Sequence, residues 1–226
     1  MTASSLDLLR APAIDELVAV GQRFAAAGMA HGSSGNLSLR LPDGHLVMSA
    51  TGAALGSLDR ATLAVLRPDG THVSGPAPTK EYGVHLGVHA DRPDVGAIVH
   101  LHSDAATAVA CLEPWSPTSA VPPLTPYFVM VCGATPRTRY AAPGTADLGL
   151  SVREALASGW AALMANHGSV TVGATLADAE RRAVELEKTC ALLTATAGRR
   201  RSLLTDAQIA ELVERFDAYW PATAAA

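Results

Sequence analysis

Two histidines separated by one residue, His100 and His102, follow an apolar run, Val95–Val99, that is typical of a buried strand. Side chains two residues apart on a strand point to the same face, so the two imidazoles are expected to lie side by side. That arrangement can bind a metal ion. The alternative is one packed and one solvated histidine, because so short a motif also occurs by chance.

Two further residues could complete such a site. His167 follows a second apolar run, Trp160–Ala165, at a glycine turn where binding sites are often built. Glu81 is expected in the first turn of a helix with Thr79 as its N-cap, where a carboxylate also stabilises the helix dipole. Three neutral histidines leave a divalent ion open positions for Lewis-acid chemistry, and a nearby carboxylate can be a ligand or a general acid/base.

The helix expected after Thr79 carries two more histidines, His85 and His89, which lie four and eight residues beyond Glu81. This spacing places all three on one helix face. They could be further ligands, but a histidine in such a position is more often a packed core residue. The sequence favours packing for His85.

Two turns bracket a predicted hairpin over residues 37–49. The loop His31–Asn36 precedes it and the turn Ala50–Ala53 follows it, so both could converge at one end of the hairpin. Exposed backbone N–H groups beside small polar side chains form a good phosphate nest. Ordinary surface loops are the alternative.

Composition narrows the class of protein. The 226 residues are expected to form one domain, 1–226. A net charge of -4 and a pI near 6.0 give no electrostatic case for nucleic acid. Three widely spaced cysteines and the absence of a targeting pattern predict reduced thiols and a cytoplasmic location. No run of apolar residues is long enough to predict a membrane span.

Hydrophobic periodicity predicts helices and strands around the candidate site. Residues 127–132 could form either, and 113–126, with five prolines, is expected to be an ordered loop. Helices are expected over 14–27, 79–91 and 105–111, after Thr145, over 176–197 and from Thr205 to Trp220. Strands are expected over 37–41, 45–49, 63–66, 71–73, 95–99 and 160–165, with 169–172 extending the last.

Taken in order, these residues resemble the class II aldolase/adducin family, whose members include fuculose-phosphate aldolase and ribulose-phosphate 4-epimerase. The resemblance covers nearly the whole chain. It implies an α/β fold, a three-layer α/β/α sandwich with a central, mostly antiparallel sheet. It also implies that His100, His102 and His167 are zinc ligands. Glu81 is implied to be the catalytic acid/base, and to bind the metal when no substrate is present. The residues implied to bind the substrate or its phosphate are Ser34, Asn36, Thr51, Gly52, Thr79 and Lys80.

The resemblance also concerns the assembly. Members are commonly homotetramers with sites at subunit interfaces. Tyr127 aligns with a catalytic tyrosine and Tyr219 with one in the C-terminal tail, so both could act in a neighbouring subunit's site. Anchoring an interface is the alternative for both.

Two departures from the aldolase pattern indicate a subgroup of the family. Lys80 replaces a phosphate-binding serine of the aldolases, and Pro143 replaces an aromatic residue. The segments 79–81, 122–130, 166–168 and 185–189 are most similar to 3-oxo-tetronate 4-phosphate decarboxylases.

This similarity implies decarboxylation of a phosphorylated sugar acid to dihydroxyacetone phosphate through a metal-stabilised enediolate. Lys80 would hold the carboxylate or the phosphate. One ion per subunit is expected, Zn²⁺ first, with Mn²⁺, Co²⁺ or Fe²⁺ as alternatives. The alternative functions are a sugar-phosphate aldolase or epimerase, and a non-catalytic, adducin-like assembly module.

Overall fold

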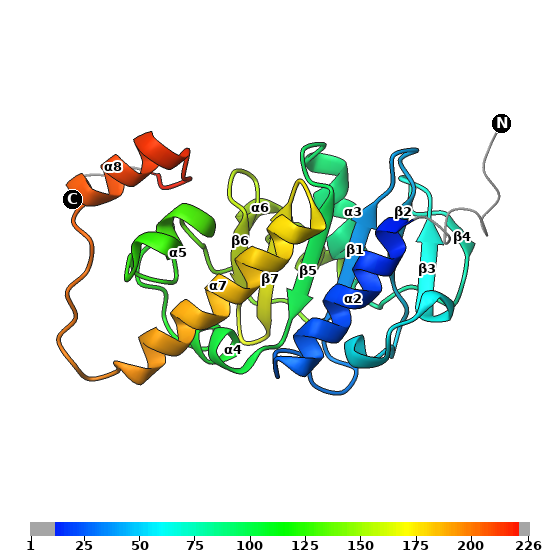
Figure 1. Ribbon diagram of the computed structural model, residues 1–226, viewed down its shortest axis with the longest axis horizontal. Coiled ribbons are helices and arrows are strands. Elements are labelled where there is room, and N and C mark those ends of the chain that lie inside the picture. Colours follow the sequence, from blue (N-terminus) through cyan, green and yellow to red (C-terminus); the bar gives the residue numbers. More distant parts are fainter. Residues whose placement is uncertain (1–11, 222–226) are drawn as a thin grey trace.

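A seven-stranded antiparallel sheet forms the centre of the structure, a computed structural model that describes residues 12–221 (Figure 1). The strand order is β4-β3-β2-β1-β5-β7-β6, and every pair of neighbouring strands is antiparallel. The strands are β1 (Asn36–Arg40), β2 (Leu46–Ser49), β3 (Leu63–Leu66), β4 (His72–Ser74), β5 (Ala97–Leu101), β6 (Ala161–Met164) and β7 (Gly168–Gly173).

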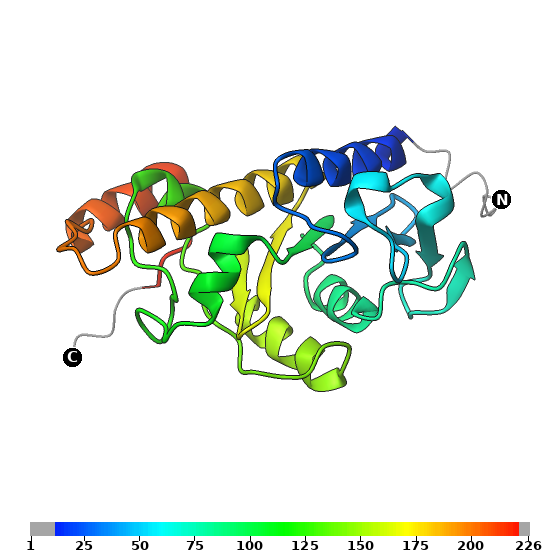
Figure 2. The ribbon, with the colours of Figure 1, turned by 90° about the horizontal axis from the view of Figure 1, so that it is seen from below.

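Helices cover both faces of this sheet (Figure 2). On one face lie α2 (Pro12–Ala26) and α7 (Leu176–Ala195), and on the other lie α3 (Tyr82–Asp91) and α6 (Ala146–Ala155). Val99 of β5 belongs to the apolar core under α2, whereas its neighbour Ile98 belongs to the core under α3 and α6. The predicted three-layer α/β/α fold is therefore confirmed.

The remaining helices are short or lie beyond the β6 side of the sheet. These are α4 (Asp104–Ala110), α5 (Pro126–Val131), α8 (Asp206–Phe216) and the 3-10 turns η1 (Leu55–Ser57) and η2 (Arg60–Thr62). Helices α4 and α5 pack against α7, and α8 packs against α5.

Several predicted element boundaries differ from those of the structure. The helix expected from Thr79 begins at Tyr82, so Glu81 occupies the N-cap position rather than the first turn, and its side chain makes no cap hydrogen bond. Residues 160–172 form two strands rather than one extended strand, because Asn166 adopts a positive φ of 56° and reverses the chain into β7. Asparagine tolerates that left-handed conformation better than most residues.

Capping chemistry explains two other elements. Segment 127–132, which periodicity left open, is helical because Pro126 starts α5 and the Thr125 hydroxyl accepts the N–H of Phe128. The last helix ends at Phe216 rather than Trp220, since Asp217 adopts a left-handed conformation with φ 52°.

Two glycines allow three strand ends to approach closely. A Cβ on Gly35, whose φ is +81°, would lie 2.8 Å from the carbonyl oxygen of His100, and one on Gly168 would lie 2.3 Å from that of Leu101. Any other residue would push β1 or β7 away from β5. The glycines therefore set the close spacing of the sheet end at which His100 stands.

The structure also bears on the expectations about the cysteines and about membrane-spanning helices. All three cysteines are free thiols, with Cys111 exposed and Cys132 and Cys190 buried. Within residues 12–221, no helix has both the length and the apolar character needed to cross a membrane.

Candidate active site

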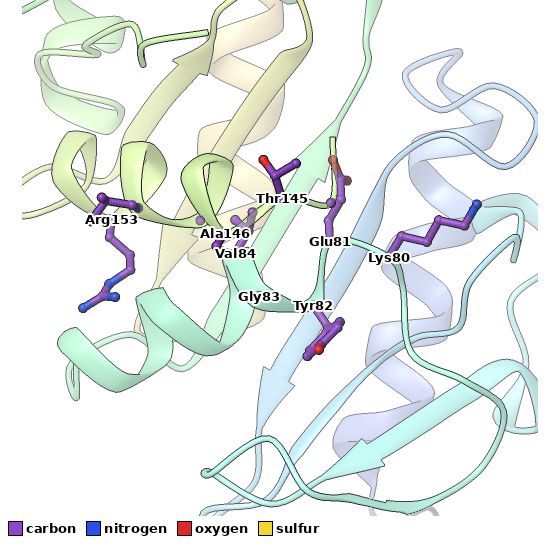
Figure 3. A pocket seen from close by; sticks show the side chains of 11 residues that line it. Lys80, Glu81, Tyr82, Gly83, Val84, Thr145, Ala146 and Arg153 are labelled. Carbon is purple, nitrogen blue, oxygen red and sulfur yellow. The ribbon is translucent and has the colours of Figure 1, made fainter. Parts of the chain in front are cut away.

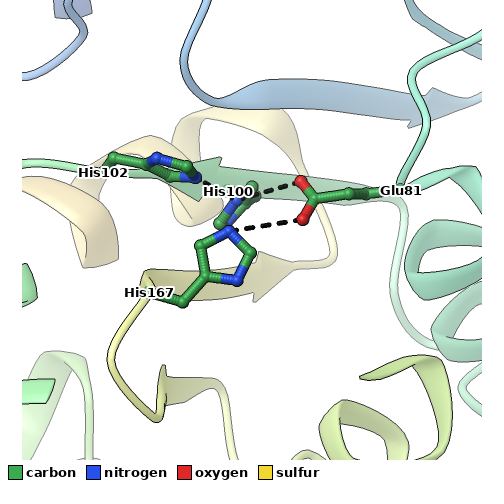
Figure 4. Close-up of side chains that lie close together, drawn as sticks. All are labelled: Glu81, His100, His102 and His167. Atoms are coloured by element: carbon green, nitrogen blue, oxygen red, sulfur yellow. Dashed lines mark hydrogen bonds and ion pairs between the residues drawn. The ribbon is translucent and has the colours of Figure 1, made fainter. Parts of the chain in front are cut away.

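The four side chains proposed as ligands meet at one end of the sheet (Figure 4). One ligand atom from each of Glu81, His100, His102 and His167 lies within 4.8 Å of the others. Nε2 of His100 is 2.9 Å from Nε2 of His102 and 3.2 Å from Oε2 of Glu81. Nε2 of His167 is 3.3 Å from Oε1 of Glu81. The sequence prediction that these four residues lie together is therefore correct.

Strand pairing brings the three histidines together. His100 lies near the end of β5, and His102 follows that strand. Leu101 pairs with Ser169 of β7, so His167, two residues before Ser169, lies beside the end of β5. Antiparallel pairing thus joins imidazoles that are more than sixty positions apart in the sequence.

Glu81 is held by the segment that precedes α3. The N–H of Thr51 donates to the carbonyl of Ala77 at 2.9 Å, and the N–H of Thr79 donates to that of Ser49 at 3.0 Å. These bonds fasten the segment to the end of β2. The Thr79 hydroxyl, expected to cap the helix, instead accepts the N–H of Glu81 at 3.3 Å. The carboxylate of Glu81 is consequently directed at the histidines.

The cluster has the donor set of a divalent metal site. Nδ1 of His100 lies 2.9 Å from the carbonyl oxygen of Ser169, which can only accept, so Nδ1 carries a proton, and Nε2 is the ring atom that faces the cluster and could bind a metal ion. Burial and the neighbouring histidines lower the pKa of His102 to about 4, and they lower the pKa of His167 as well. Oε1 of Glu81 is buried without a hydrogen-bond partner. Several lone pairs thus converge, and a cation would satisfy them.

The charge of Glu81 is fixed by its surroundings. Burial by itself would raise the pKa of this carboxyl group. Contacts with His100, the amide of Asn36 and His167 outweigh that effect and hold the pKa well below its ordinary value. Nδ2 of Asn36 donates to Oε2 at 2.8 Å, so Oε1 is the carboxylate oxygen left for ligand or proton. Glu81 is therefore an ionised carboxylate at neutral pH.

A cleft of about 330 Å³ opens beside the cluster. Every residue predicted to bind the substrate or its phosphate lines this cleft, together with Glu81, His102 and His167. Pro143 also contributes to the wall. The predicted residues are Ser34, Asn36, Thr51, Gly52, Thr79 and Lys80. The two turns that bracket the β1–β2 hairpin therefore do converge.

Two predicted residues lie elsewhere in the chain. Tyr127 is on α5, and its side chain is 65% exposed. Tyr219 is partly buried after α8, and its carbonyl accepts the N–H of Ala134 at 2.8 Å. Neither belongs to the described lining of the cleft. Their action in the site of a second copy stays a prediction.

A second hollow, of about 340 Å³, lies between α3 and α6 on the other side of Glu81 (Figure 3). Its one guanidinium, that of Arg153, forms two hydrogen bonds with the carboxylate of Asp91, at 2.6 and 2.8 Å. Lys80 and Glu81 line this hollow as well as the cleft, and the side chain of Lys80 extends away from Thr145 and Arg153.

A carboxylate distant in sequence supports the turn that follows His102. Glu187 of α7 accepts the hydroxyl of Ser103 at 2.6 Å and the N–H groups of Ala105 and Ala106 at 2.9 and 2.8 Å. Ser103 is the N-cap residue of α4, but its own side chain makes no cap hydrogen bond. No local signal indicates this contact, because Glu187 is more than eighty residues away.

Replacing Glu187 by Ala is expected to lower the free energy of unfolding by about 1.5–3 kcal/mol, because three hydrogen bonds to a charged, partly buried group are lost. Urea unfolding of the metal-free protein measures the change. The control is Glu154→Ala, which removes an exposed ion pair with Arg139. Equal effects of the two substitutions would contradict the capping role of Glu187.

Comparison with known proteins agrees with this geometry. The class II aldolase and adducin N-terminal domain matches residues 15–194. A 3-oxo-tetronate 4-phosphate decarboxylase of Escherichia coli O6:H1 is 40% identical over 198 residues, covering 88% of this chain and 93% of that protein. An L-fuculose phosphate aldolase of the same strain is 31% identical over 196 residues, covering 85% and 88%.

A solved structure extends the likeness to the fold. The crystal structure of YgbL from Escherichia coli superposes with a TM-score of 0.85 at 38% identity, covering 88% of this chain and 96% of that one. The named relatives are a decarboxylase and an aldolase, which supports lyase chemistry, and the cluster at the cleft could hold the divalent metal of such enzymes. By sequence, fold and site, the chain belongs to the class II aldolase and adducin family.

Proposed function

We propose that this protein is a metal-dependent carboxy-lyase that converts a 3-oxo-tetronate 4-phosphate into dihydroxyacetone phosphate and carbon dioxide. The observation that carries the proposal is that Lys80 shares one cleft with Glu81 and the histidine cluster. The relatives named as 3-oxo-tetronate 4-phosphate decarboxylases support this substrate class. Zn²⁺ is the metal proposed first, although Mn²⁺, Co²⁺ and Fe²⁺ also suit imidazole and carboxylate ligands.

The lining of the cleft suits a substrate with two anionic ends. Ser34, Thr51 and Gly52 offer hydroxyl and backbone N–H groups of two turns, which suit a phosphate. Lys80 is exposed on the wall, and the ion pairs among residues 12–221 do not include it. Its ammonium group is therefore free to bind the carboxylate before cleavage or the phosphate throughout.

The reaction needs a proton carrier and a stabilised anion. A divalent cation held by the three histidines would supply positive charge against the negative charge that develops on the substrate oxygens. Oε1 of Glu81 takes the proton of the substrate 2-hydroxyl. The C1–C2 bond then breaks and carbon dioxide leaves. The electron pair of that bond stays on the substrate and forms the enediolate across C2 and C3. Glu81 returns the proton to C2, and a solvent proton on the 2-oxygen completes dihydroxyacetone phosphate.

The test is to incubate the metal-loaded protein with 3-oxo-tetronate 4-phosphates and, separately, with fuculose 1-phosphate. Release of carbon dioxide and dihydroxyacetone phosphate in equal amounts supports the decarboxylase. Aldehyde release without carbon dioxide would reject it in favour of an aldolase. Failure to bind a divalent metal at stoichiometric level, measured by elemental analysis, would support the adducin-like assembly module instead.

We also propose a homotetramer with sites at subunit interfaces. Tyr127 is largely exposed and lies outside the described lining of the cleft in its own subunit. An exposed tyrosine of this kind fits a contact with another copy. The basis of this assignment is the family resemblance, and the mass of the protein in solution tests it.

Replacing Lys80 by Met is expected to raise KM for the phosphorylated acid about ten- to a hundredfold, since a charge-assisted contact contributes roughly 1.5–3 kcal/mol. Steady-state kinetics at low and high salt measure the change. The chain's second lysine, Lys188, gives the matched control, because Lys188→Met changes an exposed side chain on α7. An unchanged KM for Lys80→Met would contradict an anion-binding role.

A further inference from the structure

A chain of hydrogen-bonded side chains runs from the candidate active site into the protein between β1 and α3. Nδ2 of Asn36 lies 2.8 Å from Oε2 of Glu81, and Oδ1 of the same amide contacts Nε2 of His85. The contacts continue through a serine, a second histidine and an arginine. From the interior to the site the members are Arg40, His89, Ser38, His85, Asn36 and Glu81.

The periodicities of the two elements make this chain possible. Asn36, Ser38 and Arg40 alternate along β1 and face α3, while the side chains of Leu37 and Leu39 enter the core on the opposite face. Two residues of a strand rise about 6.6 Å, and four residues of a helix rise about 6 Å. Histidines four residues apart on α3 therefore fall between alternate residues of β1.

The site end of the chain fixes the direction of its hydrogen bonds. The NH₂ group of Asn36 donates to Oε2 of Glu81, so Oδ1 of the same amide faces His85. Nε2 of His85 then carries the proton and donates to Oδ1. Nδ1 of His85 is left as an acceptor for the hydroxyl of Ser38, at 2.7 Å.

The interior end of the hydrogen-bond chain agrees with the same direction. With its proton given to His85, the Ser38 oxygen accepts from Nε2–H of His89 at 3.0 Å. Nδ1 of His89 is then an acceptor, and Nη2 of Arg40, which can only donate, lies 3.3 Å from it. The carbonyls of His89, Arg92 and Val95 also accept from Arg40, and that of Val95 lies 3.3 Å from Nδ1 of His89. The hydrogen bonds that begin at the site end therefore place Nε2–H at His85 and His89, and Arg40 is positioned to donate to Nδ1 of His89.

His85 and His89 are both neutral rings with a single ring proton. Burial lowers the pKa of His85 to about 3, and it lowers the pKa of His89 to about 4. Each ring is therefore neutral at neutral pH and carries one N–H. A single proton per ring is what an ordered, one-directional chain requires.

We propose that His85 is a positioning residue, which fixes the side-chain amide of Asn36 so that its NH₂ group faces both Glu81 and the cleft. One amide hydrogen holds the carboxylate of Glu81, and the second is presented to an anionic or carbonyl oxygen of the substrate. Ser38 and His89 set the tautomer of His85. The consequence for activity rests on the proposed function, whereas the tautomers do not.

The hydrogen-bond chain from Arg40 to Glu81 does not conduct protons. An amide group passes a proton on only through a high-energy tautomer, and the guanidinium of Arg40 keeps its proton at any ordinary pH. The Asn36 amide thus separates Glu81 from the two buried histidines. The role of the chain is to orient groups.

The first arm of the test determines the tautomers directly. Long-range ¹H–¹⁵N spectra of protein labelled with [¹⁵N]histidine, recorded at neutral pH, are expected to show His85 and His89 as neutral rings with the proton on Nε2. Substitution of each residue assigns its signals. A proton on Nδ1 of His85 would overturn the proposal whatever the protein catalyses.

The second arm measures turnover. Ser38→Ala and His85→Phe are each expected to lower kcat about ten- to a hundredfold with unchanged metal content, the usual effect of losing an outer hydrogen-bond partner. His85→Gln retains an amide donor toward Asn36 and is expected to recover most of the activity lost in His85→Phe. Ser38→Ala serves alone if His85→Phe does not fold.

The matched control is Ser119→Ala. The Ser119 hydroxyl is also fully buried and also makes two hydrogen bonds, at 2.8 and 3.1 Å, but it lies in the loop before α5. Equal kcat values for Ser38→Ala and Ser119→Ala, with an active wild type, would overturn the proposal. An inactive wild type would instead reject the proposed function and leave the tautomer arm to decide.

Discussion

Glu81→Gln is expected to lower kcat by about 10²–10⁴-fold, the usual contribution of a positioned general acid/base, while metal content stays near one ion per subunit. The amide keeps the shape of the carboxylate and can still accept the bond from Asn36. It cannot take a proton from the substrate and return it to C2. The three histidines stay in place to hold the ion.

The measurement pairs single-turnover kinetics with elemental analysis of the same sample. Glu154→Gln, an exposed position on α6, controls for the loss of one negative charge. Normal turnover in Glu81→Gln would show that the acid/base role is wrong. Loss of both turnover and metal would assign Glu81 chiefly to ligation of the ion.

His102→Ala is expected to abolish stoichiometric metal binding and to lower turnover by more than about a thousandfold, since loss of Lewis-acid stabilisation costs several kcal/mol in the transition state. The folded structure should persist, because His102 follows the end of β5 and faces the cleft rather than an apolar core. Elemental analysis after dialysis and urea unfolding of the metal-free protein test the two statements separately.

His72→Ala is the control for His102→Ala, because His72 is an exposed histidine on the edge strand β4. It should keep both metal and activity. A His102→Ala protein that retains a full complement of metal would contradict the assignment of this residue as a ligand. Unfolding of the metal-free variant at much lower urea than the metal-free wild type would show a structural role instead.

Much of the site could be predicted from short-range regularities. Alternation along a strand places His100 and His102 together, and glycine-rich turns mark the segments around Asn36 and Thr51. The family resemblance then connects His167 and Glu81 to them. These features are encoded within a few residues of each group, so a sequence pattern is sufficient to indicate them.

Contacts between distant segments were not predictable in this way. Thr79 and Ser103 both have the chemistry of a helix cap, yet α3 begins later and α4 is capped by Glu187 from α7. Asn166 reverses the chain into a hairpin, where the sequence pattern indicated a glycine turn followed by an extension of the same strand. In each case a tertiary contact or a single backbone conformation outweighs the local preference.

The sequence by itself determined which residue types could form a Lewis-acid centre: three imidazoles, one carboxylate and a cation, carried on strands and turns able to present them. Only the tertiary structure decided what surrounds Glu81. The rise of β1 over two residues matches that of α3 over four, and this match turns His85 from a packing residue into part of a directed hydrogen-bond chain. Such a match depends on how two elements lie against each other, and neither element's own sequence specifies that.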